Sequence, residues 1–192
     1  RNTAQRHGIM RKTAILLVAL LLTVPFAVSK EGRDSASAQV TALAVAQTSQ
    51  GFVGTSAAVD VTVLSEGAGR VFVATKPLTQ QDMQASARLA SQVASRTLGA
   101  DWDAQDYLVS FTGDSEVIGG PSAGAVMTLA LLVAMHNLEN PDAGWKLDAT
   151  VAATGTINPD GTVGPVGGIP AKAEAAAAKG IKVFLYPAGL DI

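Results

Sequence analysis

Cysteine is absent from this chain of 192 residues, and histidine occurs only twice, as His7 and His136. The missing thiols exclude a disulfide scaffold and a cysteine nucleophile. Charged residues make up 16% of the chain and the formal net charge is −2, so no basic surface for a nucleic acid is expected. The sequence contains no Gly-Lys-Ser or Gly-Lys-Thr, which excludes a Walker-type phosphate loop. We therefore expect no nucleic-acid partner, no cofactor and no ATP use within this chain.

The N-terminal 29 residues differ in composition from the rest. Residues 13–29 carry no charge and are rich in Leu, Val and Ala, and the first acidic residue is Glu31. Four basic residues precede this apolar run: Arg1, Arg6, Arg11 and Lys12. The pattern predicts a signal peptide or a short N-terminal membrane anchor over residues 1–29, and a buried core helix is the alternative. The basic flank then predicts an extracytoplasmic protein, either secreted or membrane-anchored.

Residues 30–39 are polar and are predicted to be a linker, and residues 40–192 are predicted to be one domain. The hydrophobic fraction of the chain, 48%, is sufficient for a core. Strand and helix patterns alternate along this part. Strands are expected at 40–46, 59–64, 70–75, 107–112, 147–157, 162–166 and 183–186, with the second and third forming a hairpin. Helices are expected after Thr79, after Gly124 and over 171–179. Thr79 is expected to cap the first of these helices, with help from Asp82. The interleaving predicts an α+β domain, of α/β type, with a mixed sheet and packed helices.

One stretch is suited to nucleophilic catalysis. Gly119, Gly120 and Pro121 predict a sharp turn directly before Ser122, and an uncharged helix follows it. Ser122 is therefore expected at a helix N-terminus, where free backbone N–H groups can stabilise an oxyanion. We interpret Ser122 as a nucleophile, with N–H groups near Gly120 and Ser122 as oxyanion donors.

A serine nucleophile requires a base. His136 follows Ser122 by fourteen positions on the same expected helix, which places it about 21 Å away at ~1.5 Å per residue. His7 lies in the N-terminal segment. Lys172 fits better, because it falls in the first turn of a short Ala-rich helix with small or apolar neighbours. Burial and the helix dipole both disfavour a charged lysine there, so we interpret Lys172 as the base.

Several motifs of this chain, in their order and spacing, resemble those of the proteolytic domain of the Lon protease family. The resemblance rests on Gly120-Pro121-Ser122-Ala123-Gly124, Ala153-Thr154-Gly155-Thr156-Ile157, Gly161, and Gly167-Gly168-Ile169 with Lys172. It covers residues 59–187 and is greatest to Lon-like proteins without a fused ATPase, including membrane-linked archaeal ones. Two departures are Gly119, where many Lon proteases have an acidic residue, and Thr156, where the family motif has glutamate.

The resemblance implies an ATP-independent serine endopeptidase with a Ser122–Lys172 dyad and Thr154 beside the lysine. It also implies polypeptide substrates, unfolded or membrane-associated, and assembly into a homo-oligomeric ring. The family domain normally continues beyond the last expected strand, so we expect residues 40–192 to be truncated at the C-terminus. The alternative hypothesis is a catalytically inactive Lon-like domain that serves as a binding or assembly module at the membrane.

No metal site is expected. Asp101, Asp103 and Asp106 are close in sequence, and a solvated loop explains them more simply than a carboxylate cluster. Asp160 belongs to the turn at residues 158–161, which turn chemistry alone explains.

Overall fold

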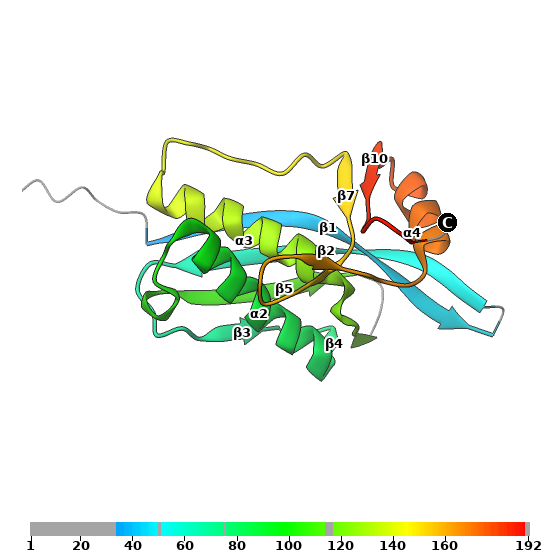
Figure 1. Ribbon diagram of the computed structural model, residues 1–192, viewed down its shortest axis with the longest axis horizontal. Helices are drawn as coiled ribbons and strands as arrows, with labels where there is room; N and C mark the ends of the chain where they lie inside the picture. The colour runs from blue at the N-terminus through cyan, green and yellow to red at the C-terminus, as the bar shows by residue number, and fades with distance from the viewer. Residues whose placement is uncertain (1–33, 50, 75, 114–116, 191–192) are drawn as a thin grey trace, which may run out of the picture. The chain divides into compact units, whose positions relative to one another are not determined.

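A long antiparallel hairpin is the centre of the fold (Figure 1). Strands β1 (Ser35–Thr48) and β2 (Gly51–Leu64) pair along their whole lengths. Side chains alternate between the two faces of a strand, and the alternate residues Val59, Val61 and Val63 are fully buried. The computed structural model describes residues 34–49, 51–74, 76–113 and 117–190. The predicted signal peptide or anchor, residues 1–29, lies outside the described residues.

Further strands extend the hairpin into a mixed sheet of six, in the order β10-β7-β1-β2-β5-β3. Strand β5 is antiparallel to β2, and β3 is parallel to β5. On the other side, β7 is parallel to β1 and β10 is parallel to β7. The bounds are β3 Val71–Val73, β5 Asp106–Thr112, β7 Val151–Ala153 and β10 Val183–Leu185. The predicted α+β class with a mixed sheet is confirmed.

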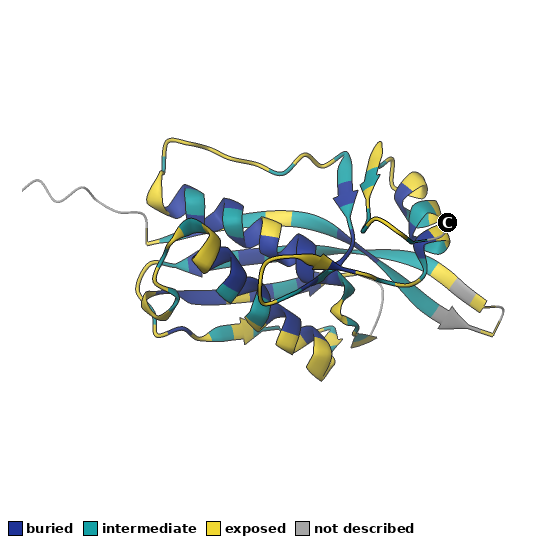
Figure 2. Cartoon of the chain, in the orientation of Figure 1, coloured by how far each residue is buried: buried dark blue, intermediate teal, exposed yellow. Residues whose placement is uncertain are grey.

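Helices cover both faces of this sheet. Helices α2 (Gln81–Leu98) and α3 (Gly124–Glu139) bury the face that contains Val61, in the main core. Helix α4 (Ile169–Ala178) packs on the opposite face, where Leu43 and Ala176 form a second apolar cluster. Helix α3 is buried along much of its length (Figure 2). Together with η2, over Pro121–Glu139, it is long and apolar enough to cross a membrane, but 72% of its most apolar window is buried, as in a core helix.

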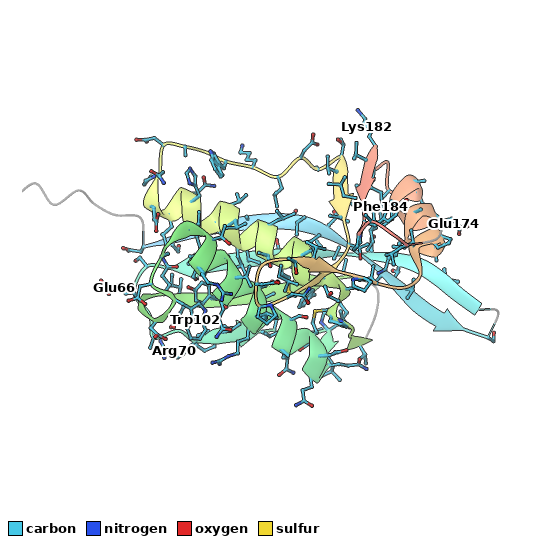
Figure 3. The ribbon with its side chains drawn as sticks, viewed as in Figure 1. Glu66, Arg70, Trp102, Glu174, Lys182 and Phe184 are labelled. Atoms are coloured by element: carbon cyan, nitrogen blue, oxygen red, sulfur yellow. The ribbon has the colours of Figure 1, made fainter. Side chains whose placement is uncertain are left out.

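Close contact between α4 and the hairpin depends on a glycine. A Cβ atom at Gly54 would lie 1.8 Å from the carbonyl oxygen of Ala171, so only glycine lets the helix backbone approach β2 this closely. In Figure 3, Glu174 of α4 and Phe184 of β10 lie at one end of the molecule, and Arg70 and Trp102 lie at the other. The short remaining elements are β4 Leu78–Thr79, β6 Val117–Ile118, β8 Thr156–Ile157, β9 Val163–Gly164, η1 Trp102–Ala104 and η2 Pro121–Ala123.

Three expectations about local structure are wrong. Residues 35–39 belong to β1 rather than to a linker, because they pair with β2. The hairpin partner of β2 is β1, whereas β3 adds to β5 in parallel. Thr79 does not cap α2: it lies in β4, and the N-cap residue Gln80 makes no side-chain cap hydrogen bond.

Asp106 is not part of a solvated loop, which corrects a fourth expectation. It is 2% exposed and forms an ion pair with Arg70. Its carboxylate also accepts from the N–H groups of Ala68 (2.9 Å) and Arg70 (3.0 Å). The hydrogen bond from Arg70, with help from the Ala68 N–H, lowers the pKa of Asp106 to about 2. Asp106 therefore stays ionised at neutral pH. Through these hydrogen bonds it joins residues 68–70, directly before β3, to the first residue of β5.

Candidate functional site

Ser122 lies at the start of the main core helix, as the sequence predicted. It occupies the short helix η2, and α3 begins two residues later at Gly124. Gly120 has a φ of 88°, a conformation that favours glycine, and this turns the chain into η2. The N–H groups in the first turn of a helix have no partner within the helix, so Ser122 sits among backbone donors.

The backbone of Ser122 is fixed by the segment that leaves β7. The N–H of Gly155 donates to the Ser122 carbonyl oxygen at 2.9 Å. The hydroxyl of Thr154 donates to the same oxygen at 3.3 Å. In return, the N–H of Ala125 donates to the Gly155 carbonyl at 3.0 Å. The start of α3 is thus held against residues 154–155, which the sequence analysis had singled out only through the resemblance.

Lys172 reaches the same place from the other face of the sheet. Helix α4 starts after Gly168, and the Lys172 N–H donates to the Gly168 carbonyl at 3.0 Å, which fixes Lys172 in the first turn. The side chain is 2% exposed. Its Nζ donates to Thr154 Oγ1 at 3.1 Å. Thr154 therefore accepts from Lys172 and donates to Ser122, and it links the two residues.

The electrostatic surroundings of Lys172 favour the neutral amine. Within the described parts of the chain, the one ion pair joins Arg70 to Asp106, so no carboxylate neutralises Lys172. Burial removes water from the ammonium group and lowers the pKa of Lys172 below its ordinary value of 10.5. A neutral buried amine beside a serine is the state that a lysine base requires.

Two features of the site differ from a fully assembled dyad. Among the described residues, no hydrogen bond joins Ser122 Oγ directly to Lys172 Nζ; the connection passes through Thr154. Catalytic hydrogen bonds are often long before substrate binds. In addition, the Gly120 N–H, an expected oxyanion donor, is engaged by Asp82 Oδ2 at 3.0 Å. Sequence reasoning missed this contact, because it treated Asp82 only as a helix-capping residue.

An apolar groove adjoins Thr154. It has a volume of about 420 Å³. Its walls come from α2, α3, the β8–β9 hairpin and the segment after β10, and they include Leu129, Leu132, Ile157 and Val163. Leu129 and Val163 are among the exposed large hydrophobic residues of the protein. The groove is therefore able to take an apolar side chain next to the Ser122–Thr154–Lys172 cluster.

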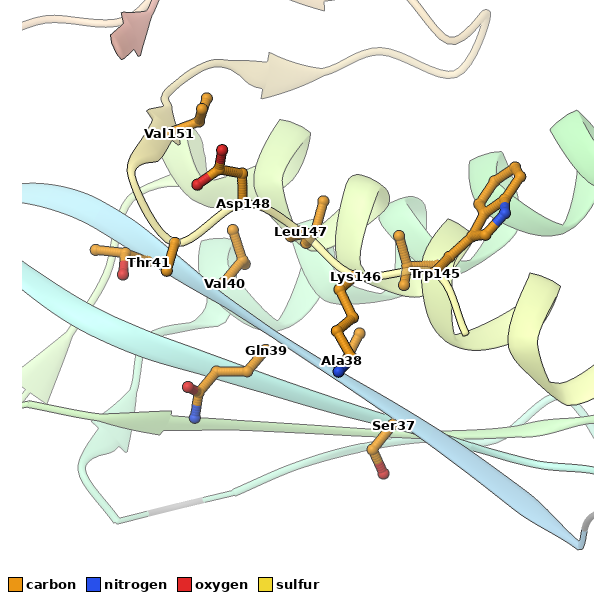
Figure 4. Close-up of a pocket in the computed structure, with 12 residues that line it drawn as sticks. Ser37, Ala38, Gln39, Val40, Thr41, Trp145, Lys146, Leu147, Asp148 and Val151 are labelled. Carbon is orange, nitrogen blue, oxygen red and sulfur yellow. The ribbon is translucent and has the colours of Figure 1, made fainter. Parts of the chain in front are cut away.

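Another hollow lies away from this cluster. It has a volume of about 320 Å³ and lies between β1 and residues 145–151 (Figure 4). Neither Ser122 nor Lys172 lines it. His136 stacks on Trp145 with ring centroids 3.6 Å apart, in the last turn of α3, whereas Ser122 precedes the first turn. The structure therefore keeps His136 away from Ser122, as expected. No group of three potential metal ligands occurs within the described residues.

Comparison with known proteins finds matches to Lon proteases. A family model described as the Lon protease (S16) C-terminal proteolytic domain matches residues 17–190. The archaeal Lon protease of Archaeoglobus fulgidus is 32% identical over 149 residues, which cover 78% of this chain and 22% of that protein.

Two shorter alignments agree with this match. Lon protease 2 of Bacillus subtilis is 36% identical over 92 residues, or 48% of this chain and 15% of that protein. The archaeal Lon protease of Thermoplasma acidophilum is 33% identical over 97 residues, or 50% of this chain and 14% of that protein. The chain therefore spans less than a quarter of the length of these relatives.

Proposed function

The chain belongs to the Lon protease proteolytic-domain family, and we propose that it is an ATP-independent serine endopeptidase in which Ser122 is the nucleophile and Lys172 the general base. One observation is the main support: a buried lysine, which has no carboxylate partner among the described residues, is linked through Thr154 to the backbone of Ser122. A structural lysine gains nothing from such burial, since desolvation of its charge costs free energy. A lysine that must be neutral to act as a base does gain from it.

The first half of the proposed reaction forms an acyl-enzyme. Neutral Lys172 accepts the proton of Ser122 Oγ as that oxygen attacks the carbonyl carbon of the peptide bond. Backbone N–H donation at the start of η2, from Ser122, stabilises the negative charge that develops on the carbonyl oxygen. The Lys172 ammonium then donates its proton to the leaving nitrogen, the C–N bond breaks, and the acyl group remains on Ser122.

The second half repeats these steps with water. Lys172, neutral again, accepts a proton from a water molecule that attacks the acyl carbonyl carbon. The same N–H group holds the oxyanion. Lys172 returns the proton to Ser122 Oγ as the ester bond breaks, which releases the second product as a carboxylic acid and restores the free enzyme.

Thr154 orients Lys172 in this account, and its replacement by valine should weaken the reaction. Valine keeps the shape but accepts no hydrogen bond, so Nζ loses its partner and its fixed position. We expect a fall in kcat of about 10- to 100-fold, by analogy with the loss of supporting contacts at other sites. The kinetic pKa should also move down, because an acceptor of the ammonium group is lost. Thr154→Ser, measured in the same kcat–pH series, should restore both values; unchanged kinetics in Thr154→Val would contradict the role.

The proposed substrates are polypeptides with apolar side chains near the cleaved bond. The support is the groove beside Thr154, whose walls include Leu129, Leu132 and Val163. Unfolded chains expose such side chains, whereas folded proteins bury most of them. The composition of residues 1–29 supports an extracytoplasmic location, with membrane attachment if that segment is retained. Assembly into a homo-oligomeric ring is proposed from the family alone.

A non-catalytic binding or assembly module is the second candidate function. The observation that favours it is the engaged Gly120 N–H, together with the lack of a direct Ser122–Lys172 hydrogen bond among the described residues. In a module of this kind, Ser122 would be unreactive and Lys172 would stay charged.

Nucleotide independence is tested by incubation of the protein with an unfolded polypeptide and no nucleotide. We expect cleavage, with the same initial rate when ATP and Mg²⁺ are added, because the chain contains no Walker-type loop. Fragments are quantified by mass spectrometry. Cleavage that requires ATP would contradict nucleotide independence. Absence of cleavage under both conditions, from a folded protein, would favour the binding module.

A further inference from the structure

The loop that precedes Ser122 is anchored by the segment that precedes and opens α2. Strand β6 (Val117–Ile118) pairs in parallel with β4 (Leu78–Thr79). The N–H of Gln80 then donates to the Ile118 carbonyl at 2.9 Å. The chain next passes through Gly119 and Gly120, which have no side chains that could hold them in place. Their position therefore depends on contacts made to their backbone.

Asp82 makes such a contact. Its Oδ2 accepts from the Gly120 N–H at 3.0 Å, and its Oδ1 accepts from the Met83 N–H at 2.7 Å. Met83 is 3% exposed and lies in the main core, so the second contact fixes the carboxylate to a rigid part of α2. Hydrogen bonds from backbone N–H groups to a carboxylate are stronger than those between neutral groups. The peptide unit two residues before Ser122 is thus tied to the core by one side chain.

We propose that Asp82 is a positioning residue for the nucleophile, which fixes the Gly120 peptide and thereby the direction in which Ser122 enters η2. This inference rests on the proposed protease function. Gly120, at a φ of 88°, and Pro121, whose φ is restricted, lie between this N–H and Ser122. The position of the Gly120 N–H therefore affects the path by which the chain reaches Ser122. A displacement of about 1 Å at a reacting group can lower a rate by ~100-fold. Asp82 takes no part in bond making and acts only through the glycine turn.

The engaged Gly120 N–H also assigns the oxyanion donor. The carboxylate occupies this N–H, and the N–H groups of Gly124 and Ala125 donate to the carbonyls of Pro121 and Gly155. The Ser122 N–H is therefore the donor that we assign to the developing oxyanion. The exposed position of Asp82 keeps its charge in contact with water, which screens its repulsion of the oxyanion.

The test compares Asp82→Ala with Asp82→Asn. Asparagine retains one oxygen, which can accept from the Gly120 N–H, but its NH2 group cannot accept from the Met83 N–H. Alanine removes both acceptors. We expect Asp82→Ala to lower kcat by about 10- to 100-fold with KM changed less than ~3-fold. Asp82→Asn, which keeps the acceptor for the Gly120 N–H, should lower kcat less than Asp82→Ala. Gln81→Ala is the matched control: it removes an exposed side chain one residue earlier on α2 and should leave kcat unchanged.

Amide hydrogen exchange of Gly120 provides a readout that does not require activity. The Gly120 amide should be protected in the parent protein and in Asp82→Asn, and should exchange faster in Asp82→Ala, while the amides of the α3 core remain protected. Faster exchange with lowered kcat supports the proposal. Unchanged exchange, or faster exchange with unchanged kcat, overturns it. Failure of the parent protein and Gln81→Ala to cleave polypeptides, with Gly120 protected in both, would instead refute the protease function from which the inference starts.

Discussion

Replacement of Ser122 by alanine is expected to abolish peptide hydrolysis and leave the fold intact. Loss of the nucleophile should lower kcat by about 10⁴-fold or more, as in other serine enzymes. The fold should survive because its contacts at this position use the Ser122 carbonyl oxygen, which alanine retains. Within the described chain, the Ser122 hydroxyl itself makes no hydrogen bond on which the structure depends. Fragment analysis with an unfolded substrate measures the first effect, and thermal unfolding measures the second.

Ser65→Ala is the control for this substitution. Ser65 is exposed and directly follows β2, and its N–H donates to the Asp34 carbonyl at 2.9 Å. Its loss should change neither kcat nor the unfolding midpoint. Undiminished hydrolysis by Ser122→Ala would show that another residue is the nucleophile or that a contaminant cleaves the substrate.

Replacement of Lys172 by methionine should also remove activity, but it should increase the stability of the fold. Loss of the base should lower kcat by about 10²- to 10⁴-fold. The free energy of unfolding should increase, because methionine fills the same buried space without a group that must give up a proton or be desolvated. A more stable but inactive variant would separate a functional lysine from one that holds the fold together.

The stability effect has a defined pH dependence. The pKa of Lys172 is lower in the folded protein than the value of 10.5 for an exposed lysine. Between these two values the unfolded chain binds more protons than the folded one, so the stability of the parent protein rises with pH across this window. Lys172→Met should lack this rise. Its free energy of unfolding should exceed that of the parent protein by the largest amount at pH values below the pKa of Lys172 in the folded protein. Lys179→Met, at an exposed position at the end of α4, is the control; a lower unfolding midpoint in Lys172→Met at neutral pH would contradict the account.

Lys172→Arg tests whether positive charge alone is sufficient. Arginine cannot lose its proton in a protein, so this variant should be as inactive as Lys172→Met. It should also be less stable than the parent protein, because a permanent charge replaces a group that can lose its charge.

Several parts of the fold followed from local sequence. Three elements were predicted from their own residues: the uncharged helix after Gly124, the Ala-rich helix over 171–179 and the strand over 107–112. The helices follow from uncharged or Ala-rich runs that begin after glycine or proline. The turn at 158–161 was predicted from turn residues alone, and the Gly161 N–H indeed bonds to the Asn158 carbonyl. Ser122 at a helix start followed from the same signals.

Strand pairing and side-chain partnership did not follow from local sequence. The turn at residues 66–69 suggested a hairpin between 59–64 and 70–75, yet β2 pairs with β1 along the full length of both strands. Asp106 was grouped with Asp101 and Asp103 because they are close in sequence, although its partner is Arg70, 36 positions away. Contacts between distant parts of a chain are decided by packing of the whole sheet, which no local window contains.

In the site, too, residues in local motifs were predicted, whereas a contact between distant residues was not. Ser122, Lys172 and Thr154 were chosen from local motifs and from the family resemblance, and the structure brings all three together. Asp82 was missed in this role, since its partner lies 38 positions away and is a backbone N–H of glycine. A glycine amide has no side-chain signal in the sequence, so only coordinates reveal such a contact.

The measurement that tests the central claim most directly is the pH dependence of Ser122 acylation by a reactive serine probe, quantified by mass spectrometry. The account predicts that the labelling rate rises with pH through a pKa below 10.5, the ordinary lysine value, and that labelling is lost in Lys172→Met. Labelling that persists in Lys172→Met with the same pH profile would show that Lys172 is not the base. No labelling of Ser122 in the folded protein would contradict the Ser122–Lys172 dyad itself.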